Sequence, residues 1–268
     1  MTREQHRTVT DDAVGITWYR WIPGGASARH DVPVVLHHGF VSSTTGNWEN
    51  TGIVAALLEA GRVVVGIDAR GHGRSDAPHD PAYYGEARMA ADVSQVMDDI
   101  RRPEFDLVGY SMGAIVALLV AAADPRVRRL VVGGVGAGIV ELGGLDTRHA
   151  SVDALVHALT TDDPDSLPAS VRGFRRMADA NGSDRLALAA HASVRHASPI
   201  DLAAVTARTL VLAGSDDPLA VRPEVLADAV PDGRLQLVDG DHLGALRDPA
   251  FTQALVEHVG AQKSGSVS

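Results

Sequence analysis

Short runs of apolar residues recur along the chain, and the stretches between them carry apolar residues at helical spacing. Each run is almost continuously apolar, which is typical of a parallel strand covered on both faces. Strands that alternate with helices imply βαβ units and a mostly parallel sheet. We therefore predict an α/β fold with strands over residues 33–38, 62–67, 105–110, 127–134, 208–214 and 234–240.

The N-terminal segment and three later stretches complete this pattern. Residues 6–10 and 15–21 are rich in Thr, Val, Trp and Tyr on either side of a polar turn, which predicts a β-hairpin. Residues 86–101 carry one apolar face, typical of a surface helix, whereas 112–123 is apolar on all sides and is expected to lie buried against the sheet. Asp248 and the proline after it suit the start of a last helix.

One long segment, residues 139–205, contains no strand candidate. Helix-like stretches within it lie at 151–159, 168–180 and 184–196. We interpret the segment as a helical cap inserted into a core, and a decorated crossover without a lid function is the alternative. This division assigns residues 1–138 and 206–262 to one discontinuous core domain, 139–205 to the cap and 263–268 to a flexible tail.

The residues Gly109-Tyr110-Ser111-Met112-Gly113 form a GxSxG pentapeptide between a predicted strand and a predicted helix. A nucleophile elbow requires this context, because a sharp strand-to-helix turn exposes the serine hydroxyl. Small residues on both sides let neighbouring segments approach closely. The turn also puts Ser111 near a helix N-terminus, where the backbone amide of Met112 is expected to stabilise a developing oxyanion.

Together with three further motifs, this pentapeptide resembles the α/β-hydrolase family over about residues 6–260. His38-Gly39-Phe40 follows a predicted strand where that family donates a second oxyanion amide, which the resemblance assigns to Phe40. The stretch DARGHGRS at 68–75 is similar to the family's DxRGxGxS loop. The resemblance implies the α/β-hydrolase fold, with a mostly parallel central sheet, helices on both faces and a short helical cap insertion.

Two later turns are similar to those that carry the family's acid and base. Gly214-Ser215-Asp216-Asp217 resembles the turn of the acid, with a spacing that favours Asp217 and leaves Asp216 as its rival. Gly240-Asp241-His242 resembles the turn of the histidine, and the order Ser, Asp, His is the family's own. The resemblance implies that His242 takes the proton of Ser111 and that Asp217 orients the imidazole.

A serine at position 111 disfavours haloalkane dehalogenases and epoxide hydrolases, relatives that use aspartate at this position. We expect a hydrolase acting on a small molecule with an ester-like carbonyl, either a carboxylic ester or a lactone or thioester, and with a small or medium, largely neutral acyl group. Phe174, Met177 and Leu243 are expected to bind the substrate. Alternatives are a cofactor-free haloperoxidase, a lyase or a C–C bond hydrolase with the same triad, and a binding protein that has lost catalysis.

Composition narrows the choice of partners. The 268 residues are 45 % hydrophobic and 22 % charged, as in ordinary globular proteins, and the net charge of −10 offers no basic stripe for nucleic acid. The chain has no cysteine and no compact ligand motif such as HExxH, so we expect neither a metal nor a cofactor. The polar N-terminus and the lack of a ~20-residue apolar run predict a cytoplasmic protein without a membrane partner. We also expect a monomer or homodimer.

Twelve histidines supply other candidates for chemistry. We interpret His37, His72, His191 and His196 as structural or surface residues, although His37 and His72 have positions that suit the border of the pocket. The GGVGAG stretch at 133–138 lacks the spacing of a dinucleotide-binding loop, and its small residues are expected to let the chain pass over the active site.

Overall fold

The computed structural model describes residues 2–24, 30–146, 148 and 151–260. Eight strands form one sheet in the order β1-β2-β4-β3-β5-β6-β7-β8. Strand β2 is antiparallel to both β1 and β4, and the remaining neighbours are parallel. The strands are β1 (Thr2–Val9), β2 (Gly15–Ile22), β3 (His30–His37), β4 (Arg62–Ile67), β5 (Phe105–Tyr110), β6 (Val127–Gly133), β7 (Arg208–Gly214) and β8 (Gly233–Val238).

Nine α-helices and five shorter helical turns accompany these strands within the described residues. The α-helices are α1 (Ile53–Glu59), α2 (Glu86–Ile100), α3 (Met112–Ala123), α4 (Ala137–Leu142), α5 (Val152–Thr160), α6 (Ala169–Ala180), α7 (Arg185–Ser193), α8 (Pro223–Ala229) and α9 (Pro249–Gly260). The shorter ones are a π-helical turn η1 (Thr45–Glu49) and the 3₁₀ turns η2 (Pro81–Tyr83), η3 (Pro164–Ser166), η4 (Leu202–Ala204) and η5 (Ala245–Arg247).

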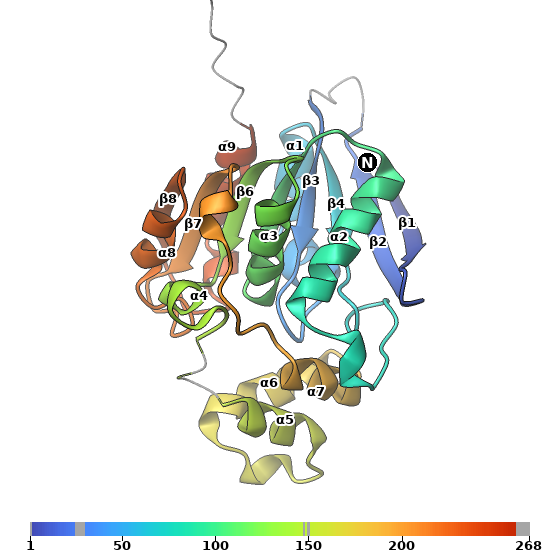
Figure 1. Ribbon diagram of the computed structural model, residues 1–268, viewed down its shortest axis with the longest axis vertical. Coiled ribbons are helices and arrows are strands. Elements are labelled where there is room, and N and C mark those ends of the chain that lie inside the picture. The colour runs from blue at the N-terminus through green and yellow to red at the C-terminus, as the bar shows by residue number, and fades with distance from the viewer. Residues whose placement is uncertain (1, 25–29, 147, 149–150, 261–268) are drawn as a thin grey trace, which may run out of the picture.

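The sheet is covered on both faces, which confirms the predicted fold class. Figure 1 shows α2 and α3 in front of the central strands, where α3 is buried along most of its length as its apolar sequence predicts. Their side chains share one buried cluster, which includes Met89 and Ile115. A second cluster joins α1 and α9 to the sheet, with Leu57 and Leu255 among its members.

The predicted strands agree closely with the observed ones, and those at 62–67, 105–110 and 208–214 match residue for residue. The N-terminal hairpin is also present, since β1 and β2 pair from Thr2–Ile22 to Val9–Gly15. The short helices α1, α4 and α8 were not predicted, because six or seven residues give too few turns for helical periodicity to stand out. Helix α7 ends at Ser193, three residues before the predicted end.

Helices α5, α6 and α7 lie together at one end of the sheet (Figure 1). They bury a cluster of their own, with Leu155, Val171 and Leu188 among its residues, and Val41 of the core completes it. Asn181 strengthens this junction by donating a hydrogen bond from its side chain to the carbonyl oxygen of Val41 (2.9 Å). The division into core and cap stays a prediction, and the tail predicted for 263–268 lies outside the described residues.

The loop after β4 is held by buried hydrogen bonds. The Asp68 carboxylate accepts from the amides of Thr44 (2.8 Å) and Arg74 (3.0 Å), so it fixes both ends of the loop 68–75 against the chain after β3. Arg70 is almost fully buried and forms a two-point ion pair with Asp92 of α2, at 2.8 and 2.7 Å. These contacts give the DARGHGRS motif a structural role beside the site.

No helix in the described parts of the chain is long and apolar enough to cross a bilayer.

We predict that Asp92→Asn destabilises the fold by about 2 kcal/mol, because the buried guanidinium of Arg70 loses the carboxylate that binds it at two points and keeps only the more exposed carboxylate of Asp12. Urea unfolding followed by circular dichroism measures the effect. Asp98→Asn on the same helix is the control, since its carboxylate is 65 % exposed and its pairing with Arg126 is expected to contribute less than about 1 kcal/mol. Equal losses in the two variants would contradict the role given to the Arg70 pair.

Candidate active site

Ser111 occupies the turn between β5, which ends at Tyr110, and α3, which begins at Met112. Its backbone has φ 56° and ψ −117°, a conformation that costs a residue other than glycine about 1–3 kcal/mol. The amide of Ser111 donates to the carbonyl oxygen of Gly133 (2.7 Å), which ties the strained turn to β6. The turn therefore has the form predicted for a nucleophile elbow.

The two glycines of the pentapeptide allow this turn to pack. A Cβ atom at Gly109 would lie 2.0 Å from the carbonyl oxygen of Gly113, and one at Gly113 would lie 2.2 Å from the carbonyl oxygen of His37. Both contacts are with backbone atoms, which cannot rotate away as a side chain can. The first turn of α3 therefore sits directly against β5 and the end of β3.

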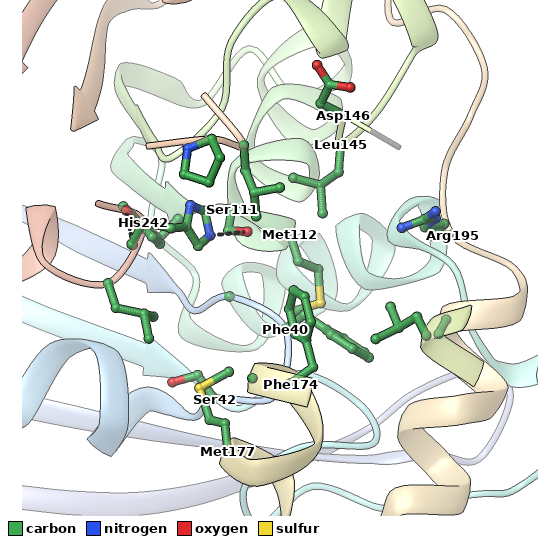
Figure 2. A pocket seen from close by; sticks show the side chains of 18 of the residues that line it. Phe40, Ser42, Ser111, Met112, Leu145, Asp146, Phe174, Met177, Arg195 and His242 are labelled. Carbon is green, nitrogen blue, oxygen red and sulfur yellow. Dashed lines mark hydrogen bonds between the residues drawn. The ribbon is translucent and has the colours of Figure 1, made fainter. Parts of the chain in front are cut away.

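Hydrogen bonds join three residues that are far apart in sequence. The Nε2 atom of His242 lies 3.0 Å from the Oγ atom of Ser111, and its Nδ1 atom lies 2.8 Å from Oδ2 of Asp217. His242 follows β8 and Asp217 follows β7, so each side chain reaches the site from the carboxyl end of a parallel strand. Figure 2 shows the His242 ring directed at Ser111.

The two adjacent aspartates of the acid turn have different surroundings. The side chain of Asp217 is fully buried, and its second oxygen accepts from the amide of Leu219 (2.8 Å). Asp216 is exposed and has its neighbour Ser215 as side-chain partner. The structure thus pairs His242 with Asp217, the residue that the spacing favoured.

Tyr110 is a site residue that sequence analysis did not single out. Its hydroxyl donates to the backbone carbonyl of His242 (2.6 Å), although the two residues are 132 positions apart. Burial and the charge of Asp217 raise the pKa of Tyr110 well above its ordinary value, so the phenol stays protonated as a donor. Its position beside the serine in the pentapeptide was the available signal.

The two residues whose amides are expected to form an oxyanion hole, Phe40 and Met112, line the same cavity as Ser111. The amide of Met112 is the first of α3 and so has no acceptor within the helix. Phe40 follows Gly39, whose own amide donates to the side chain of Asn47 (2.7 Å) in the π-helical turn. Asn47 thus holds the chain before Phe40 in place, and no sequence motif had pointed to it.

A cavity of about 580 Å³ opens in front of Ser111 and His242. All the residues predicted to contact substrate line it, namely Phe40, Met112, Phe174, Met177 and Leu243. Figure 2 shows Phe40, Met112 and Phe174 grouped near its middle. Glu86, Leu145, His191 and Arg195 also line the cavity and were not predicted to do so. Most of its wall is apolar, as is usual for small-molecule sites.

Among the residues that the structure describes, no group of three or more His, Cys, Asp or Glu side chains is arranged to hold a metal ion.

Comparison with known proteins identifies the family. The family model for the alpha/beta hydrolase fold matches residues 32–196, which is more than half of the chain. The chain belongs to the α/β-hydrolase fold family. The resemblance seen in the sequence motifs is therefore confirmed.

Similar α/β-hydrolases differ in the reactions that their names describe. A protein of Variovorax paradoxus with the provisional name carbamate hydrolase RutD is 34 % identical over 223 residues, or 76 % of this chain and 84 % of the relative. A Pseudomonas putida 2-hydroxy-6-oxo-2,4-heptadienoate hydrolase is 37 % identical over 132 residues, which cover 47 % of each chain. The solved esterase of Exiguobacterium antarcticum superposes with a TM-score of 0.75 at 24 % identity, covering 95 % of this chain and 99 % of that one.

This α/β-hydrolase buries a group of histidine rings next to the Phe40 ring. The rings of His38 and His72 lie 5.3 Å apart, and those of His72 and His191 lie 5.9 Å apart. His37 and His72 are buried and are not among the residues that line the cavity, whereas His191 is. His196 is half-buried and is not a lining residue either. His38 has a structural role, since its Nε2 accepts from the amide of Ala69 (3.0 Å).

Burial lowers the pKa of three histidines, His37, His38 and His72, and so favours their neutral form. Burial and the neighbouring His38 lower the pKa of His37 to about 3, and burial also lowers the pKa of His38. Burial and the neighbouring histidines hold the pKa of His72 well below its usual value. Below pH 6.5 the unfolded chain binds protons at these positions that the folded chain does not, so acid favours unfolding.

We predict that stability falls as the pH drops from 7.5 to 5, by about 2 kcal/mol for each histidine that stays neutral in the fold. Urea unfolding at both pH values measures the loss of stability. Both pH values lie above the range in which most carboxylates titrate. His72→Asn should reduce the loss, because asparagine does not titrate. His157→Gln, at a surface position on α5, should leave the loss unchanged. A loss of the same size in His72→Asn would refute this account.

Proposed function

We propose that this α/β-hydrolase cleaves a carboxylic ester, or a related lactone or thioester, through Ser111, His242 and Asp217. The observation that carries the proposal is the unbroken chain of hydrogen bonds from the Ser111 hydroxyl through His242 to the buried Asp217 carboxylate. That chain opens onto an apolar cavity large enough for a small or medium acyl group.

The first half of the proposed reaction acylates the enzyme. Oγ of Ser111 bonds to the substrate carbonyl carbon as its proton passes to Nε2 of His242. Asp217 keeps the imidazole oriented and stabilises the positive charge that forms on it. The tetrahedral intermediate then expels the alcohol, which takes the proton from His242, and an acyl group remains on the serine.

The second half returns the enzyme to its starting state. Water gives a proton to His242 and bonds to the acyl carbon, the bond to Ser111 breaks, and the serine recovers that proton. One ester and one water thus yield one acid and one alcohol. In both halves the oxyanion would accept hydrogen bonds from the amides of Met112 and Phe40, and the N-terminus of α3 adds a favourable dipole.

The comparisons bear on which carbonyl compound is used. The provisional name of the Variovorax relative makes carbamates a second candidate, because the serine attacks a carbonyl carbon there too. The Pseudomonas relative's name supports the C–C bond hydrolase that the sequence left open. Haloperoxidase and lyase activity stay predictions, as do a cytoplasmic location and a monomeric or homodimeric state.

We predict that the protein hydrolyses some members of a series of p-nitrophenyl esters and that Ser111→Ala lowers kcat about 10⁴-fold or more, since no other group replaces the nucleophile. Release of p-nitrophenolate measures the rate. A fluorophosphonate probe should label the unmodified protein and fail to label Ser111→Ala. Hydrolysis that survives in the variant would rule out the serine mechanism.

The adjacent residues Asp216 and Asp217 allow matched variants that test which of them is the acid of the proposed triad. We predict that Asp217→Asn lowers kcat by about 10⁴, because the amide favours the wrong tautomer of His242. Asp216→Asn, one residue away and exposed, should retain the rate of the unmodified protein. Steady-state kinetics with one p-nitrophenyl ester compares the two, and the reverse result would move the acid to position 216.

A further inference from the structure

Arg195 brings to the wall of the cavity a cation for which no described residue provides an ion-pair partner. It follows α7, lines the same cavity as Ser111 and is half-buried. Its Nη2 atom is buried, and within the part of the chain that the structure describes it has no hydrogen-bond partner. A buried guanidinium N–H without an acceptor is costly, so the site is suited to a ligand that supplies one.

The segment that carries Arg195 is fixed from two sides. On one side its neighbour His196 donates its amide to the buried Glu86 carboxylate (2.5 Å) at the start of α2. On the other side the segment packs directly against backbone, since a Cβ atom at Gly144 would lie 2.2 Å from the carbonyl oxygen of His196 and one at Gly143 would lie 2.4 Å from that of Ser198.

Glu86 lines the cavity too, but its carboxylate is already engaged. It accepts from the amide of His196 and lies 3.5 Å from Nε2 of His191. Burial alone would raise the pKa of Glu86, but these contacts outweigh it and lower the pKa. No ion pair within 4 Å joins Glu86 to Arg195 in the described chain, so the Glu86 carboxylate acts on the arginine through its charge and leaves the Nη2 donor without an acceptor.

Arg195 lies across the cavity from the reacting groups. Figure 2 shows Ser111 and His242 on one side and Arg195 on the other, with the side chains of Met112 and Phe40 between them. A ligand that reaches both sides must have a carbonyl at one end, an apolar middle that packs on these side chains, and a hydrogen-bond acceptor at the other end.

We propose that Arg195 binds a carboxylate of the substrate, so that the favoured substrates are esters that carry an acid group at the end remote from the scissile carbonyl. The inference rests on the proposed ester hydrolysis and names its substrate class. A carboxylate offers two oxygens to the guanidinium and neutralises its charge, which a neutral acyl chain cannot do.

Two esters with acyl chains of similar length test this directly, mono-4-nitrophenyl adipate with a free carboxylate and 4-nitrophenyl heptanoate without one. We expect kcat/KM to favour the adipate ester in the unmodified protein, and Arg195→Gln to lower the ratio of the two values about 10- to 100-fold, mainly through KM. Arg195→Lys should restore part of the preference. Arg176→Gln, at an exposed position on α6, is the control and should leave the ratio unchanged.

A binding measurement separates this inference from the proposed reaction. Calorimetric titration of Ser111→Ala with monomethyl adipate should show binding that is lost when Arg195→Gln is added, and methyl heptanoate should bind equally to both proteins. Turnover of both esters without a preference, or a preference that persists in Arg195→Gln, overturns the role of Arg195 and leaves the hydrolysis intact. Carboxylate binding through Arg195 without turnover of any ester overturns the hydrolysis alone.

Discussion

The close packing of one strand-to-helix turn is the constraint on which the site depends. Ser111 stays in a strained backbone conformation because its amide bonds to β6 and because α3 begins in direct contact with the backbone of β5 and β3. A side chain at position 113 would push that helix away from His37. The hydroxyl would then leave the line that joins it to His242 and Asp217.

Most of the fold was predictable because its signals are local. The parallel strands are short apolar runs that need no partner to be recognised, and β4, β5 and β7 have the predicted bounds. The positions of Ser111, Asp217 and His242 were predictable from the resemblance of their turns to family motifs. Each of these turns comes after a strand, and the carboxyl ends of parallel strands meet at one edge of the sheet. The spacing within the acid turn favoured Asp217 over Asp216, and Asp217 is the residue that forms the hydrogen bond with His242.

The remaining features depend on contacts between distant segments. Arg195 and Glu86 meet at the cavity because α2, α7 and the chain after α4 pack together there, and neither residue belongs to a motif. Asn47 was not predictable for the same reason. It binds the amide of Gly39 from a π-helical turn, and the apolar pattern of the sequence gives no sign of that turn. The helices α1, α4 and α8 were too short to predict, although α1 packs on β4 and α8 packs on β7 and β8.

The bond from Tyr110 to the backbone of His242 has a consequence for motion at the site. The phenol belongs to the residue directly before Ser111, so the strand that leads to the serine also anchors the loop that carries His242. A displacement of β5 would therefore move Ser111 and the backbone of His242 together, which helps to maintain the distance between them. The imidazole can still rotate about its own side-chain bonds. The proposed transfer of a proton from the serine to the leaving group requires only such a small rotation.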